Sequence, residues 1–116
     1  MDDQGTEMVS FQLVAAAGEA RSLAFEALEK AKAGDFDAAA KLTKQSKDAG
    51  IQAHHIQTQL LWTEAAGEHL SVDVLLVHAQ DHLMCSMLAQ ELVQELGSSG
   101  HPCAPSPAWL RRSRWS

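Results

Sequence analysis

Residues 13–36, with the sequence LVAAAGEARSLAFEALEKAKAGDF, set the fold class of this chain. Apolar side chains recur there at steps of three or four residues, which is the spacing of one face of an α-helix. The helix is predicted from about residue 7 to residue 33. Gly34 can adopt the left-handed conformation that ends a helix, and Asp35 can cap the next one, so a tight reversal is expected. The apolar face comprises Leu13, Ala16, Ala20, Leu23, Ala27 and Ala31.

A second helix is predicted to begin near Phe36, directly after this reversal, and to end near Glu64. Gly50 lies in its middle and weakens it by roughly 1 kcal/mol relative to alanine. Its apolar face is made mostly of small residues, which allow close packing against a neighbouring helix. This face comprises Ala39, Leu42, Ser46, Ala49, Ala53, Ile56 and Leu60.

The third helix is predicted from Val74 to near Gly97, after a loop at residues 65–69 and a cap at Ser71 or Asp73. A short strand at residues 72–77 is the alternative. No other segment offers a partner strand, and an isolated strand leaves its backbone groups unpaired, so helix is favoured.

These three helices and their short connections predict an all-α fold, an antiparallel three-helix up-down-up bundle. Such a small bundle leaves much apolar surface uncovered. The third helix carries apolar residues on more than one face, which favours self-association.

Function is expected at the segment His78-Ala79-Gln80-Asp81-His82, a polar cluster inside an apolar run. On a helix, His78, Asp81 and His82 project from one side, and Gln80 points elsewhere. Three interpretations are open. The histidines could be hydrogen-bonded packing residues, or they could bind a metal with Asp81. Alternatively, one histidine could be a nucleophile that carries a phosphoryl group.

Two motifs that the chain lacks restrict the metal-binding and the phosphoryl-carrier interpretations. A metalloprotease needs Glu directly after the first histidine of its helix motif, and Ala79 stands there. The chain also has no Gly-rich loop of the P-loop type, so a phosphoryl group would have to come from another protein rather than from bound ATP.

Composition excludes further classes. The chain has 116 residues and a formal net charge of −6, which argues against a nucleic-acid partner and an anionic membrane surface. The first ten residues, MDDQGTEMVS, lack the basic and long apolar regions of a secretory signal. The two cysteines indicate no disulfide framework, so a cytoplasmic location is expected.

The segment 72–84, VDVLLVHAQDHLM, resembles the active-site helix of the lactose/cellobiose/chitobiose-type enzyme IIA proteins of the bacterial phosphoenolpyruvate:sugar phosphotransferase system. Three further segments support the resemblance: AGEARSLA at residues 17–24, AGDF at 33–36 and AHHIQT at 53–58. Together these matches span roughly residues 7–96, in the order and on the helices expected from periodicity.

The resemblance implies a phosphotransferase that works as a homotrimer of three-helix subunits. His78 would accept a phosphoryl group from phospho-HPr and pass it to a cysteine of the cognate IIB component, during disaccharide uptake through the membrane component IIC. Gln80 and His82 would orient His78 or contact the phosphoryl oxygens. Asp81 would meet its two symmetry copies around one divalent metal ion per trimer, with Mg²⁺ expected. A non-catalytic helical module for metal binding or oligomerisation is the alternative.

The C-terminal residues depart from this family. Residues 1–96 form the expected IIA domain and contain all 15 acidic residues, whereas residues 97–116 contain three prolines and Arg111, Arg112 and Arg114. The prolines exclude a regular helix there. We expect a disordered tail that phosphoryl transfer does not need. A frame change near the end of the reading frame would explain this tail. Alternatively, the tail would be an appendage that binds a partner.

Overall fold

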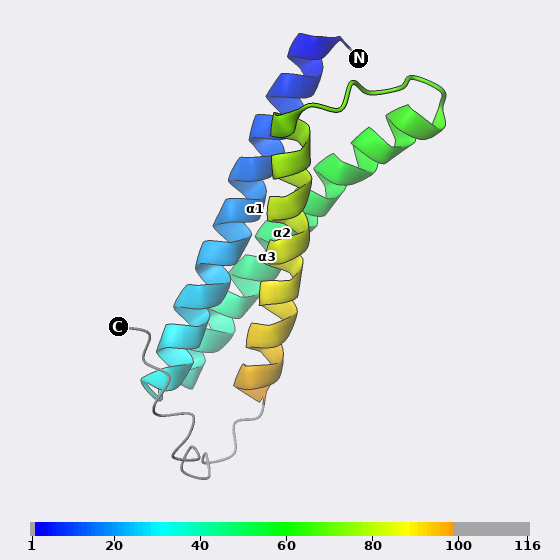
Figure 1. The fold of residues 1–116 in the computed structure, drawn as a ribbon. Coiled ribbons are helices and arrows are strands. Elements are labelled where there is room, and N and C mark those ends of the chain that lie inside the picture. The colour runs from blue at the N-terminus through cyan, green and yellow to red at the C-terminus, as the bar shows by residue number, and fades with distance from the viewer. Residues whose placement is uncertain (1, 99–116) are drawn as a thin grey trace, which may run out of the picture.

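The computed structural model describes residues 2–98, which form three α-helices. They are α1 (Asp3–Lys32), α2 (Phe36–Ala65) and α3 (Val74–Ser98). In Figure 1, α1 runs down, α2 runs back up and α3 runs down again, so successive helices are antiparallel and the predicted all-α three-helix up-down-up bundle is confirmed. The predicted tail lies outside the described residues, apart from residues 97 and 98, which continue α3.

Helix α1 begins four residues earlier than predicted. The Asp2 side chain caps it by accepting a hydrogen bond from the Gly5 amide at 2.7 Å. The first two buried positions are Thr6 and Ser10. Because these are polar, an apolar period is visible in the sequence only from Leu13 onward.

The reversal between α1 and α2 is the predicted one. Gly34 has φ +82°, and the Asp35 side chain accepts a hydrogen bond from the Ala38 amide at 3.1 Å. The amides of Gly34 and Asp35 donate back to Ala31 and Lys30, at 3.0 and 2.9 Å. This pattern satisfies the last carbonyls of α1 and turns the chain sharply.

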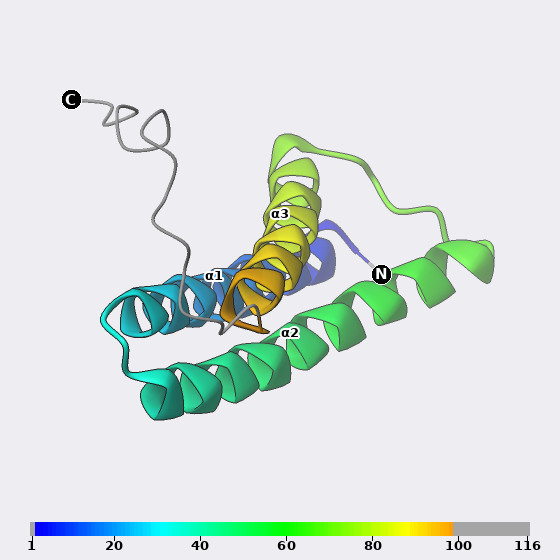
Figure 2. The same ribbon diagram turned by 90° about the horizontal axis from the view of Figure 1, so that it is seen from below.

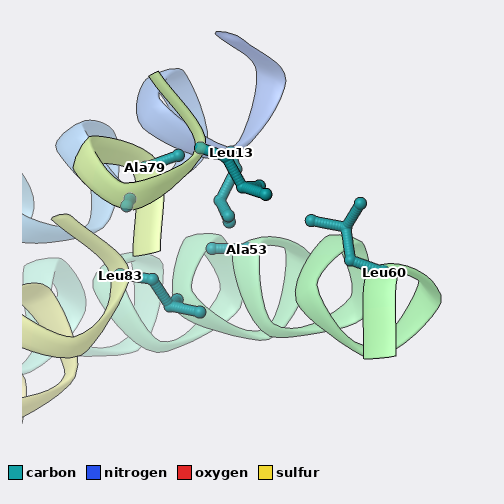
Figure 3. Close-up of a cluster of buried hydrophobic side chains, with 7 residues drawn as sticks. Leu13, Ala53, Leu60, Ala79 and Leu83 are labelled. Atoms are coloured by element: carbon teal, nitrogen blue, oxygen red, sulfur yellow. The ribbon is translucent and has the colours of Figure 1, made fainter. Parts of the chain in front are cut away.

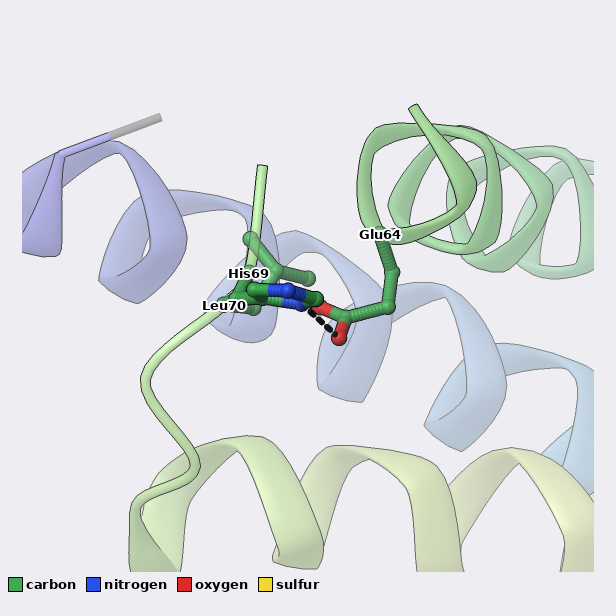
Figure 4. Close-up of polar contacts among 3 residues, drawn as sticks. All are labelled: Glu64, His69 and Leu70. Atoms are coloured by element: carbon green, nitrogen blue, oxygen red, sulfur yellow. Dashed lines mark hydrogen bonds and ion pairs between the residues drawn. The ribbon is translucent and has the colours of Figure 1, made fainter. Parts of the chain in front are cut away.

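The loop between α2 and α3 is held by one carboxylate. Glu64 accepts hydrogen bonds from the Leu70 amide and the His69 ring nitrogen Nδ1, both at 2.8 Å (Figure 4). These contacts, with the Leu70 amide first, lower the pKa of the Glu64 carboxyl. The tether is therefore intact at neutral pH and is lost as the pH falls through that lowered pKa. Asp73, one of the two predicted caps, accepts from the Leu76 amide at 2.8 Å and begins α3.

The core lies along α1, which packs against both other helices. Figure 3 shows Leu13, Ala53, Leu60, Ala79 and Leu83 meeting there, all 3% exposed or less. Because α1 faces two neighbours, its buried face is wider than predicted and extends to Ala17 and Ala24. The predicted members Ala16, Leu23 and Ala31 are half-buried at its edges. Helix α2 diverges from α3 toward its own C-terminal end (Figure 1; Figure 2).

A polar network ties all three helices together at mid-height. The buried Ser46 hydroxyl donates to the Ala20 carbonyl at 2.6 Å. The Gln90 side-chain amide donates to the Ser46 hydroxyl at 2.9 Å and also to the Ser46 carbonyl. Gly50 makes room for this amide, since a Cβ at residue 50 would lie 2.7 Å from Gln90 Oε1.

Gly50→Ala is therefore expected to destabilise the chain slightly, although alanine is the better helix former. The gain of about 1 kcal/mol in helix propensity is offset because the displaced Gln90 loses hydrogen bonds worth about 1 kcal/mol each. In a Gln90→Ala background the same change is expected to stabilise by about 1 kcal/mol. Urea unfolding of the four proteins at one protein concentration measures both effects. Equal stabilisation in both backgrounds would contradict the role assigned to Gly50.

Across residues 2–98, no helix combines the length and the hydropathy needed to cross a bilayer.

Candidate functional site

The predicted site lies on α3, on the sides of the helix that face away from the core. Leu76, Ala79 and Leu83 are buried against the other helices and fix the rotation of α3 about its axis. With about 100° between successive residues, the positions between these anchors must lie on the flanks or the outward face.

The two histidines of the cluster form a pair on one flank. Their ring centroids are 4.4 Å apart and the ring planes meet at 75°, an edge-to-face arrangement. His78 is exposed and His82 is half-buried. His82 therefore supports one side of an imidazole whose remaining surface is open to a partner.

Asp81 lies on the outward face, exposed in the single chain. The Cys85 thiol, one turn further along, donates to Asp81 Oδ1 at 3.6 Å. Within residues 2–98 no three histidine, cysteine or acidic side chains come together closely enough to hold a metal ion.

Large apolar side chains surround Asp81 along the same face. Val77, Met84, Leu88 and Leu92 are each 55 or 56% exposed, and Val74 is 88% exposed. Such a continuous apolar face on a helix marks an interaction surface. We call this face, at residues 74, 77, 81, 84, 85, 88 and 92, the outward stripe.

On the His82 side of α3, a shallow groove separates this helix from α1. Asp81, His82 and Cys85 line it from α3, and Arg21 and Phe25 line it from α1. The Arg21 guanidinium carbon lies 5.6 Å from the centre of the Phe25 ring. Arg21 and Phe25 were not predicted to lie at the site, because they precede the cluster by more than 50 residues.

Gln80 lies on the opposite flank of α3 and faces α2. Its Oε1 accepts a hydrogen bond from the Gln57 side-chain amide at 2.8 Å. It is two residues from His78, about 200° around the helix. Within one subunit the structure therefore brings His78 and His82 together but not Gln80. Gln57 had no local signal of its own, because its partner lies on another helix.

The remaining described histidines lie elsewhere. His54 and His55 are exposed on α2, and their adjacent positions direct their rings apart. His69 contacts Glu64 in the loop.

Comparison with known proteins identifies the architecture that carries this site. Residues 8–99 match the family model described as the PTS system lactose/cellobiose-specific IIA subunit. The chain belongs to this family. It is 50% identical over 90 residues to the N,N'-diacetylchitobiose-specific EIIA component of Escherichia coli K12, covering 78% of each chain.

Solved structures agree with the IIA assignment. The cellobiose-specific enzyme IIA from Bacillus anthracis matches with a TM-score of 0.80 at 42% identity, over 85% of this chain and 89% of that one. The IIA(chitobiose) of an HPr complex from the Escherichia coli phosphotransferase system matches with a TM-score of 0.70 at 47% identity, over 81% and 91%. The resemblance noted in the sequence is thus confirmed.

Proposed function

We propose that this IIA chain is a phosphocarrier that accepts a phosphoryl group from phospho-HPr on His78. It then passes the group to a cysteine of the cognate IIB component, in the cytoplasm, during disaccharide uptake through IIC. The observation that carries the proposal is the exposed His78 ring, held edge-to-face by His82 on α3 of a IIA fold. The related IIA(chitobiose) forms a complex with HPr, which supports HPr as the donor.

The chemistry needs one nucleophilic nitrogen with an open approach. The lone pair of His78 Nε2 attacks the phosphorus of phospho-HPr. A nitrogen–phosphorus bond to His78 forms, and the bond between phosphorus and the donor breaks with its electron pair leaving on HPr. In the second step a cysteine thiolate of IIB attacks the same phosphorus. A sulfur–phosphorus bond forms while His78 leaves as an imidazole, and protonation of its ring makes it a good leaving group.

His82 has the geometry of a positioning partner for His78. A half-buried ring in contact with an exposed one restricts its rotation, so less conformational entropy is lost when the phosphorus approaches. His82 can also donate to a phosphoryl oxygen when its ring nitrogen is protonated.

The outward stripe of α3 fits a trimeric assembly. Three copies packed through this face would bury Val77, Leu88 and Leu92 and bring three Asp81 carboxylates together. At low dielectric these charges repel strongly unless a cation or protons compensate them. Oxygen ligands suit a hard divalent cation such as Mg²⁺, which when bound would neutralise the cluster.

Asp81→Leu tests this arrangement. We expect the variant to lose the bound metal, stay trimeric and unfold at the same or a higher temperature than the wild type. Replacing a buried ionic cluster with apolar side chains of similar size removes a desolvation penalty. Light scattering and metal analysis of the purified proteins measure the outcome. A monomeric wild type, or a variant that keeps its full metal content, would contradict the proposed axis.

The function itself is tested by incubation with labelled phosphoenolpyruvate, enzyme I and HPr. One acid-labile phosphoryl group per chain is expected. A wild-type chain that remains unlabelled while a control IIA protein is labelled would favour the alternative, a non-catalytic module for metal binding or oligomerisation.

A further inference from the structure

Gln57 holds the Gln80 side chain in one orientation. The Gln57 amide nitrogen Nε2, on α2, donates to Gln80 Oε1, on α3, at 2.8 Å. Both side chains are half-buried. Within residues 2–98, this is the one side-chain hydrogen bond that joins α2 to the cluster at residues 78–82.

The direction of this bond decides what Gln80 offers to a ligand. Because this bond holds Oε1 toward Gln57, the amide nitrogen Nε2 with its two hydrogens is the end of the Gln80 side chain that faces away from Gln57. A phosphoryl group presents only acceptor oxygens at neutral pH, so it is stabilised by a donor and repelled by a carbonyl oxygen. Gln57 thus leaves the hydrogen-bond donor of the Gln80 amide, Nε2, available to a phosphoryl group.

The flanks of α3 indicate which phosphoryl group Gln80 can reach. His78 and His82 lie on one flank, and Gln80 lies on the other, with the outward stripe between them. In a closed ring of three subunits the interface joins two different patches, so one flank of each α3 meets the opposite flank of the next. Packing through the stripe therefore brings His78 of one subunit toward Gln80 of its neighbour.

We infer that Gln57 is a positioning residue for phosphoryl transfer, acting through Gln80 on the His78 of a neighbouring subunit. The inference rests on the proposed phosphocarrier function and its trimer. It adds a residue of α2, Gln57, to the site.

Gln57→Glu is the sharpest test, because it reverses the hydrogen bond without changing the size of the side chain. The carboxylate can only accept, so Gln80 keeps its partner by turning Nε2 inward and Oε1 toward the phosphoryl group. Gln59→Glu is the matched control, since this exposed glutamine of α2 undergoes the same charge change. Gln57→Leu removes the bond and leaves the Gln80 amide free to rotate.

The measurement is the rate at which each full-length variant takes the phosphoryl group from phospho-HPr, at several HPr concentrations. At saturating phospho-HPr, Gln57→Glu is expected to be about tenfold slower, as for one lost hydrogen bond to a charged group, and Gln57→Leu a few-fold slower. The half-saturating HPr concentration, trimer mass and unfolding midpoint should stay near those of the wild type. Equal rates for Gln57→Glu and Gln59→Glu, with an active wild type, would overturn the inference alone. An inactive wild type would overturn the proposed function as well.

Mixed trimers test whether Gln57 acts across the subunit boundary. Gln57→Glu chains are reassembled with an excess of His78→Ala chains, so that only the first kind can be phosphorylated. The His78 ring of each Gln57→Glu chain then lies next to a His78→Ala subunit that has the native Gln57–Gln80 pair. The wild-type rate of phosphorylation is therefore expected to return. A rate that stays low would show that Gln57 serves its own subunit's site and would overturn the inference.

Discussion

His78→Ala is expected to abolish the acid-labile phosphoryl group that phospho-HPr places on this chain. Alanine has no lone pair to attack phosphorus, and the neighbouring His82 ring is half-buried. The expected loss is at least a thousandfold in initial rate, since the variant lacks the nucleophile itself. Labelling with phosphoenolpyruvate, enzyme I and HPr, followed by acid treatment, measures it.

His82→Ala is the matched control for this variant. It removes the second imidazole from the same flank of α3 and leaves His78 accessible, so reduced but detectable labelling is expected. The fold of both variants can be compared by circular dichroism, because neither position belongs to the buried core. Acid-labile phosphate on the His78→Ala chain, at a rate similar to the wild type, would show that another histidine is the carrier.

Leu88→Glu is expected to convert the proposed trimer into monomers. Leu88 lies two turns beyond Asp81 on the outward stripe and is 56% exposed in the single chain. Three glutamates placed near the three-fold axis would repel one another and would lose the burial of three leucines, each worth about 2 kcal/mol. Because each proposed site lies between subunits, the rate of His78 phosphorylation should fall together with the oligomeric mass.

Trp62→Glu provides the comparison for Leu88→Glu. Trp62 is 72% exposed, and it lies two residues after the buried Leu60, about 200° around α2. It belongs to the last turn of α2, the end that diverges from α3 (Figure 1), so the same charge there should leave the mass and the phosphorylation rate unchanged. Light scattering over a range of concentrations decides between the two outcomes. A trimeric Leu88→Glu variant would exclude the outward stripe as the trimer axis.

The ends of the helices could be predicted from the sequence because they depend on local chemistry. Gly34 and Asp35 stop one helix and cap the next through bonds that span at most five residues. Asp73 caps α3 in the same way. The start of α1 was missed, although Asp2 is an ordinary cap, because Thr6 and Ser10 hide the apolar period at buried positions.

The positions of the candidate site residues along α3 could likewise be predicted from local spacing. A four-residue spacing on a helix is enough to place His78 beside His82, and the ring contact confirms that proximity. The expectation that Gln80 points elsewhere is also borne out, since it faces α2. The catalytic roles of these residues and the metal at Asp81 remain predictions for the experiments above.

Sequence alone determined the three helices, their order and the side of α3 that carries the histidines, because periodicity and capping act within a few residues. Tertiary structure decided which distant side chains meet. The Gln57–Gln80 pair joins residues 23 apart, and the Ser46–Gln90 pair joins residues 44 apart. Such pairs depend on the rotation and divergence of whole helices, which are set by the packing of small residues along α1. Gly50 shows the difference most directly: the sequence marks it as a weak point in a helix, whereas the packed structure uses its missing side chain to admit Gln90.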